Sequence, residues 1–135
     1  MRLWHKDLIP ILPRQQLLAQ WRECCLIAKN IKKFGSPRHV LVNEIMAYPI
    51  EDFYSYCILV SLEMTYRKYK NDWTKLAGLW DFDIKRIVPY PILFKDWHND
   101  RYLKQCFYNL QEKYDRGAIP ENEWQKIERS YHELS

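Results

Sequence analysis

Residues 14–34 read RQQLLAQWRECCLIAKNIKKF, and this stretch decides the fold. Apolar side chains recur in it at the 3.6-residue period of a helix, and 100° steps place them on one face. That face consists of Leu17, Trp21, Cys24, Ala28 and Ile31. Pro13-Arg14 suits a first helical turn, and the run of residues 35–37 (GSP) stops a helix. We therefore predict one long helix from residue 14 to about residue 34.

The same helix carries two polar stripes. One lies well away from the apolar face and holds a carboxylate among amides that could hydrogen-bond a substrate: Gln16, Gln20, Glu23 and Asn30. The other is basic and holds Arg22, Lys29 and Lys33. A carboxylate beside an arginine is most often a solvated surface group. Glu23 can therefore be proposed as a catalytic residue only if another reactive group is expected close to it.

The rest of the chain also indicates helices. We expect a short turn at 42–46, a long helix at 51–69, a brief helix at 73–77, an ordered loop at 80–97, a helix at 100–114 and a last helix that starts at residue 120. Pro89 and Pro91 forbid a helix through the middle of the ordered loop. Strand patterns are weak throughout. The sequence predicts an all-α protein: one compact domain over residues 1–135, with about four to six helices packed around the long N-terminal helix.

Composition limits the possible classes of protein. The chain has 135 residues, enough for one domain that buries about two-thirds of its unfolded surface. Its apolar content of 47% and charged content of 28% are typical of a globular chain. Aromatic residues are dense, with six Trp, ten Tyr and five Phe, so a few can lie at the surface and stack on bases or wedge into a duplex. The net charge of +4 permits an anionic partner.

The sequence shows no pattern typical of a disulfide framework, a metal site, a secreted protein or a membrane protein. The four cysteines, Cys24, Cys25, Cys57 and Cys106, show no CxxC spacing and are interpreted as free thiols in a reducing cytosol. The histidines lie at residues 5, 39, 98 and 132, without the spacing of a metal site. We see no phosphate loop, serine elbow, signal peptide or membrane span. We expect no cofactor, no metal, no membrane partner and a cytoplasmic location.

The N-terminus supplies such a reactive group. An α-amino group has a reference pKa of about 7.7–8.0, against about 10.4 for lysine, so more of it is nucleophilic near neutral pH. Arg2 should leave Met1 in place, because the initiator methionine is usually removed only before small residues. The amine of Met1 could then form a Schiff base, and a carboxylate on the first helix could complete a lyase site. A frayed terminus is the common alternative.

Two segments together resemble the pyrimidine-dimer DNA glycosylases of the endonuclease V type. They are residues 1–4, MRLW, and residues 12–23, LPRQQLLAQWRE. The family pattern is an arginine next to the terminal residue, then Gln-His-Leu, three residues, an aromatic residue and Arg-Glu. Arg2, Gln15, Trp21 and the pair Arg22-Glu23 match it. The good match covers about the first quarter of the chain, and residues 98–110 are similar, less specifically, to a late helix of bacterial relatives.

The resemblance implies an all-α, metal-independent DNA glycosylase with abasic-site lyase activity on pyrimidine-dimer-like lesions. Met1 would be the nucleophile and Glu23 the catalytic carboxylate. Contacts to DNA are expected from Arg2, His5, Arg14, Gln15, Gln16 and Arg22. The implied partner is double-stranded damaged DNA, bound by a monomer in the nucleoid.

Two positions depart from the family pattern, and two other functions stay open. Gln16 stands where the family has a histidine and Leu26 where it has an arginine, and both family positions contact DNA. The lesion preference is therefore open. One alternative is a non-catalytic all-α nucleic-acid-binding module. This alternative predicts salt-dependent DNA binding that is unaffected when the N-terminus is blocked. The other is a helical domain for a protein partner, which predicts an exposed apolar patch.

Overall fold

The protein is seen in a computed structural model, which describes residues 1–77 and 84–134. The elements are η1 (Lys6–Ile11), α1 (Arg14–Phe34), η2 (Asn43–Ala47), α2 (Ile50–Tyr66), α3 (Thr74–Ala77), η3 (Ile84–Arg86), η4 (Tyr90–Ile92), α4 (Asp100–Asp115) and α5 (Glu121–Leu134), where η marks a 3-10 helix. No strand occurs within the described ranges. The all-α prediction is confirmed. Positions 80–83 of the expected loop lie outside the described residues.

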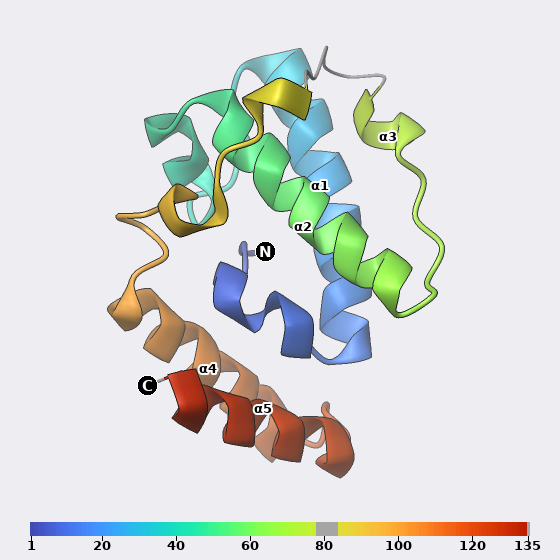
Figure 1. Cartoon of the computed structure of the whole chain (residues 1–135), viewed down its shortest axis with the longest axis vertical. Helices are drawn as coiled ribbons and strands as arrows, with labels where there is room; N and C mark the ends of the chain where they lie inside the picture. Colours follow the sequence, from blue (N-terminus) through green and yellow to red (C-terminus); the bar gives the residue numbers. More distant parts are fainter. Residues whose placement is uncertain (78–83, 135) are drawn as a thin grey trace.

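Helices α1 and α2 pack side by side and form the larger half of the molecule (Figure 1). Helix α1 ends as expected, with Gly35 in the left-handed conformation at φ 78°. The prediction for α2 was three residues too long. Its end is set by Arg67, whose guanidinium pairs with Glu63 at 2.8 Å and donates to the Leu12 carbonyl at 2.7 Å. Lys68 then takes a positive φ of 65°, which a helix cannot continue.

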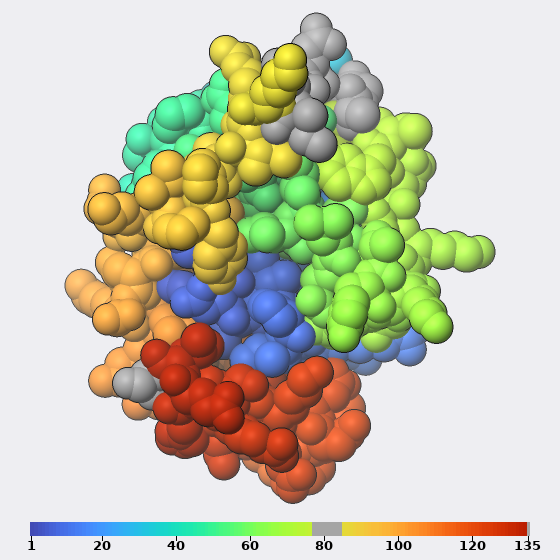
Figure 2. All heavy atoms as spheres, in the orientation of Figure 1, coloured from blue at the N-terminus to red at the C-terminus, as the bar shows by residue number. Residues whose placement is uncertain are grey.

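The first twelve residues run through the centre of the molecule, between α2 on one side and α5 on the other (Figures 1 and 2). The sequence did not predict η1, because Pro10 lies inside it and the segment is short. The expectation that the helices surround α1 holds for α2 and α3, whereas α5 packs on η1. The N-terminus is therefore held inside the fold rather than frayed from it.

Helices α4 and α5 form an antiparallel pair at one end of the molecule (Figure 1). The side chain of Asn99 caps α4 by accepting from the Tyr102 backbone N–H at 2.8 Å. Between the two helices, the rings of Phe107 and Tyr131 stack with centroids 3.8 Å apart. Glu123 of α5 accepts the backbone N–H of Arg14 at 2.7 Å, so α5 satisfies an open donor at the start of α1.

The elements share one apolar core. Its largest fully buried side chains are Tyr56, Phe53, Phe94, Leu3, Leu8, Leu12, Leu17, Ile27, Ile45, Met64, Leu76 and Leu93. The four cysteines are free, as expected, and three of them are buried. Among the described residues, no helix has the length and apolar character that a membrane crossing requires.

Candidate active site at the N-terminus

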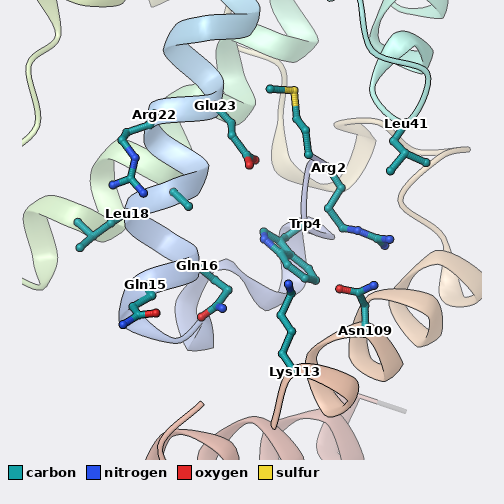
Figure 3. A pocket seen from close by; sticks show the side chains of 12 residues that line it. Arg2, Trp4, Gln15, Gln16, Leu18, Arg22, Glu23, Leu41, Asn109 and Lys113 are labelled. Carbon is teal, nitrogen blue, oxygen red and sulfur yellow. The ribbon is translucent and has the colours of Figure 1, made fainter. Parts of the chain in front are cut away.

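A cavity of about 610 Å³ opens beside the N-terminus (Figure 3). Its walls come from residues 1–4, one side of α1, one side of α4 and a single side chain from the loop after α1. The lining residues are Met1, Arg2, Trp4, Gln15, Gln16, Leu18, Ala19, Arg22, Glu23, Leu41, Asn109 and Lys113. The cavity thus gathers both predicted catalytic residues and four of the six predicted DNA contacts.

Gln20 holds the N-terminal segment against α1. It is fully buried, and its amide nitrogen donates to the Arg2 carbonyl at 2.9 Å and to a Glu23 carboxylate oxygen at 3.2 Å. Its amide oxygen accepts the backbone N–H of Trp4 at 2.8 Å. One side chain therefore fixes residues 2 and 4 relative to Glu23. The sequence placed Gln20 among amides free to bind substrate, and this was wrong, because its hydrogen-bonding capacity is used within the protein.

Two tyrosines complete this arrangement. The hydroxyl of Tyr56, on α2, lies 2.9 Å from the Gln20 amide oxygen and 2.6 Å from the Trp4 carbonyl oxygen. The hydroxyl of Tyr102, on α4, donates to the Leu3 carbonyl at 2.5 Å. We call Gln20, Tyr56 and the backbone of residues 2–4 the Gln20 cluster. Its side chains are neutral, so the position of the terminus does not depend on their ionisation.

Glu23 is half-buried at the wall of the cavity. Burial raises the pKa of its carboxyl above the ordinary value. The N-terminal ammonium, the Arg2 backbone N–H, Arg22 and His39 act on this pKa in the opposite direction. The terminal charge is therefore close enough to Glu23 for the two groups to interact. A half-buried carboxylate that lines the same cavity as an amine can stabilise positive charge and accept a proton.

Cationic and amide groups surround this pair. Arg2, Arg22 and Lys113 bring positive charge to the lining, which suits phosphate oxygens. The guanidinium of Arg2 lies 5.5 Å from the centroid of the Trp4 ring. The side-chain oxygen of Gln16 is buried and has no hydrogen-bond partner in the described part of the chain. It is an open acceptor at the position where the family pattern has a histidine.

Two predicted DNA contacts lie outside this cavity. Arg14 lines a neighbouring hollow, which shares Gln15, Gln16 and Leu18 with the main cavity. Its guanidinium lies 5.4 Å from the Tyr69 ring centroid. His5 needs a correction, since it is 3% exposed and points into the interior. Its Nδ1 accepts the Asp7 backbone N–H at 3.0 Å, so its side chain cannot reach DNA in this conformation.

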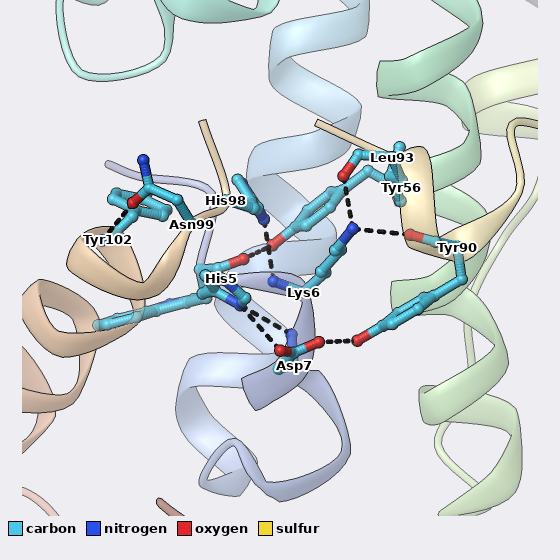
Figure 4. Close-up of polar contacts among 10 residues, drawn as sticks. His5, Lys6, Asp7, Tyr56, Tyr90, Leu93, His98, Asn99 and Tyr102 are labelled. Atoms are coloured by element: carbon cyan, nitrogen blue, oxygen red, sulfur yellow. Dashed lines mark hydrogen bonds and ion pairs between the residues drawn. The ribbon is translucent and has the colours of Figure 1, made fainter. Parts of the chain in front are cut away.

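His5 belongs instead to a buried polar group on the other side of the N-terminal segment (Figure 4). Lys6 donates from Nζ to the carbonyls of Tyr90 and Leu93, both at 2.7 Å, and its backbone N–H donates to His98 Nδ1 at 3.0 Å. The rings of His5 and His98 stack at 5.1 Å. We call His5, Lys6, Tyr90, Leu93 and His98 the Lys6 cluster. It attaches η1 to the loop before α4.

Both histidines of the Lys6 cluster favour the neutral form. Burial lowers the pKa of His98 to about 2, and the charges of His5 and Lys6 add to this. Burial also lowers the pKa of His5. Nε2 of His98 is buried without a hydrogen-bond partner among the described residues. These histidines are therefore structural, and the described residues contain no cluster of three or more His, Cys, Asp or Glu side chains suited to a metal ion.

Sequence reasoning missed the part of the site that lies far along the chain. Asn109 and Lys113 are one turn apart on α4 and face the cavity, and Leu41 reaches it from the loop after α1 (Figure 3). Their spacing on α4 could have shown that they share a face. Nothing in the sequence shows that this face lies against residues 1–4.

Comparison with known proteins identifies the family of the chain. A family model described as pyrimidine dimer DNA glycosylase matches residues 1–76, more than half of the chain. The match includes the N-terminal segment, α1 and α2, and it ends before α4. No curated protein and no solved structure matches the chain.

Proposed function

The chain belongs to the pyrimidine dimer DNA glycosylase family, and we propose that it cleaves damaged duplex DNA with the amine of Met1 as nucleophile and Glu23 as catalytic carboxylate. The observation that carries this proposal is the electrostatic proximity of the terminal amine to the half-buried Glu23, in the wall of one basic cavity. A lyase of this type needs both groups at one sugar.

The proposed reaction begins with displacement of the damaged base. The target nucleotide leaves the stack and enters the cavity, and the unprotonated Met1 nitrogen attacks C1′ of its deoxyribose. The bond from C1′ to the base breaks, and its electron pair leaves with the base. Glu23 stabilises the positive charge that develops on the sugar. The nitrogen then passes one proton through Glu23 to the ring oxygen O4′, the C1′–O4′ bond breaks with its electron pair on O4′, and a protonated Schiff base between Met1 and C1′ remains.

The second step nicks the strand. Glu23, as the carboxylate, removes a proton from C2′ of the Schiff base, and the electrons form a C2′–C3′ double bond. The C3′–O bond breaks, and the phosphate leaves with the electron pair. Water then hydrolyses the Schiff base and returns the free amine. Arg2, Arg22 and Lys113 are suited to hold the phosphates during these steps, and the mechanism uses no metal or cofactor.

The expected substrate is double-stranded DNA with a pyrimidine-dimer-like lesion, and the expected place of action is the cytoplasm, at the nucleoid. We propose a monomer, because one chain supplies the amine, the carboxylate and the basic lining. Gln15 and Gln16 are proposed to contact DNA at the same wall, and Arg14 to contact it from the neighbouring hollow.

The charge of Glu23 provides the test. The variant Glu23→Gln keeps the size of the side chain and can still meet the Gln20 amide, so we expect a normal fold. We expect nicking of DNA with an abasic site or a pyrimidine dimer to fall by at least about 1,000-fold. Glu112→Gln is the matched control, since Glu112 is 61% exposed on α4 and pairs only locally with Arg116. Nicking by folded Glu23→Gln at the rate of this control would remove Glu23 from the mechanism.

A further inference from the structure

The loop between α1 and η2 exposes two adjacent aliphatic side chains beside the cavity. Val40 is 82% exposed and Leu41 52% exposed. Single exposed apolar residues are common, but these two are consecutive and form the tip of one turn. Leu41 also lines the cavity of the candidate site.

The turn beneath this tip is braced. The Val42 backbone N–H donates to the His39 carbonyl at 3.0 Å, and the Leu41 N–H donates to His39 Nδ1 at 3.3 Å. Val42 is fully buried and Ile45 is 1% exposed, so the residues after the tip are anchored in the core. Two apolar side chains are therefore held outward on a supported turn.

Leu41 stands on a ridge between two hollows. It lines the main cavity beside Arg2 and also a second hollow of about 350 Å³ formed with Arg2, Tyr102 and Gln105. Figure 3 shows Leu41 across the cavity from α1, on the far side of Arg2. His39, two residues before it, is close enough to Glu23 to lower the pKa of that carboxyl. The tip thus projects at the rim of the place where a nucleotide would enter.

Two cationic side chains, Lys33 and Arg38, precede the tip along the chain. The guanidinium of Arg38 lies 4.2 Å from the centroid of the Phe34 ring, and Nζ of Lys33 lies 5.2 Å from it. Both cations are exposed at the end of α1 and the start of this loop. An apolar tip with cations close before it in the chain suits duplex DNA, which offers apolar base faces between two rows of phosphates. An apolar protein surface would gain nothing from these charges.

We propose that Leu41, together with Val40, forms a wedge that enters the duplex at the lesion and occupies the space from which the nucleotide is extruded. This inference rests on the proposed function and adds the element that opens the DNA. Extrusion leaves neighbouring bases without a stacking partner. The two aliphatic side chains would contact those base faces and would leave water as they do so, while Arg38 and Lys33 contact the backbone.

The test compares duplex with single-stranded DNA, because only the duplex has to be opened. The probe is a strand with one abasic site, either paired or alone, and the variant is Val40→Ala/Leu41→Ala. We expect single-turnover cleavage of the duplex to fall about 30-fold, and cleavage of the single strand to fall no more than about threefold. Leu62→Ala is the matched control, since Leu62 is 58% exposed on α2 and lines neither hollow. It should cleave both substrates normally.

A second readout does not depend on chemistry. With 2-aminopurine next to the abasic site, saturating wild-type protein should raise the fluorescence as the base loses its stacking partner, and the double variant should not. If the wild-type protein cleaves neither substrate but produces this rise, and the double variant does not, the proposed function fails and the wedge stands. If wild-type and double variant cleave the duplex equally, or if both substrates lose activity equally, the wedge is wrong and the proposed function is untouched.

Discussion

The Gln20 cluster and the Lys6 cluster hold the same N-terminal segment from two sides, but they differ in charge. The Gln20 cluster consists of neutral side chains, and Gln20 itself makes hydrogen bonds from both ends of its amide. The Lys6 cluster contains a buried cation, two stacked histidines and a buried His98 nitrogen without a partner among the described residues. We infer that the first cluster sets the geometry of the amine and Glu23, whereas the second sets the stability of the segment and its dependence on pH.

The largest effect should come from the Gln20 cluster. Gln20→Leu keeps the volume and the helix propensity but removes the hydrogen bonds from the Gln20 amide to the backbone of residues 2 and 4. We expect cleavage per folded molecule to fall about 100-fold, because a displacement of about 1 Å between reacting groups has an effect of that size. Gln125→Leu is the control, because the Gln125 side chain is exposed on α5. If the folded Gln20→Leu protein cleaves at the control rate, Gln20 does not position the amine.

The next effect is on stability and belongs to the Lys6 cluster. Lys6→Met keeps the aliphatic stem but leaves the Tyr90 and Leu93 carbonyls without their donor. We expect the free energy of unfolding to fall by about 2–4 kcal/mol, measured by urea denaturation. Lys104→Met, exposed on α4, should change it by less than about 0.5 kcal/mol. Equal stability of the two variants would contradict the inference that the Lys6 cluster stabilises the N-terminal segment.

A third effect follows from the lowered pKa values of His5 and His98. Below the ordinary histidine pKa of about 6.5, the unfolded chain binds protons that the folded chain does not bind. The stability that these neutral histidines contribute is present above pH 6.5 and is lost as the pH falls toward the folded-state values. The slope for one histidine is at most about 1.4 kcal/mol per pH unit.

Denaturation curves between pH 7 and pH 5 measure this slope. The exposed His132→Asn variant should keep the wild-type slope, and His98→Phe should reduce it. A slope that is the same in wild type and in His98→Phe would contradict the assignment of His98 to the neutral form.

The smallest effect should come from the rim of the cavity, outside both clusters. Lys113→Ala removes one cation from the lining. We expect DNA affinity to fall about fivefold, and the slope of log affinity against log salt to weaken by about 1. Stability and the cleavage rate of bound DNA should change little. Lys126→Ala, exposed on α5, is the control, and identical salt slopes for the two variants would exclude a phosphate contact at Lys113.

Periodicity and stop signals were enough to predict most of the fold. The apolar face of α1, the proline before it and Gly35 after it fixed its limits, because these signals are local. The end of α2 was predicted too far along the chain, since Arg67 bonds to carbonyls of the N-terminal segment that the local sequence does not show. The segment η1 was missed because its six residues include a proline and are too few to show the 3.6-residue spacing of apolar side chains in a helix.

The candidate site could be predicted only where it is local in sequence or matches a family pattern. Met1, Arg2 and the Arg22-Glu23 pair were identified in this way, and the structure gathers them around one cavity. His5 was expected to contact DNA as part of what the family resemblance implies, but its side chain is buried. Asn109, Lys113 and Leu41 reach the cavity through tertiary packing, which no spacing along the chain reveals.

The most direct measurement is borohydride trapping on duplex DNA with one abasic site, using protein whose Met1 amine is free. We predict a covalent protein–DNA band, and tryptic cleavage after Arg2 should place the adduct on the Met1-Arg2 peptide. The band should disappear when the amine is acetylated or when residues are added before Met1. A band that survives blocking of the amine, or an adduct on Lys6 or Lys113, would contradict the claim that the N-terminus is the nucleophile.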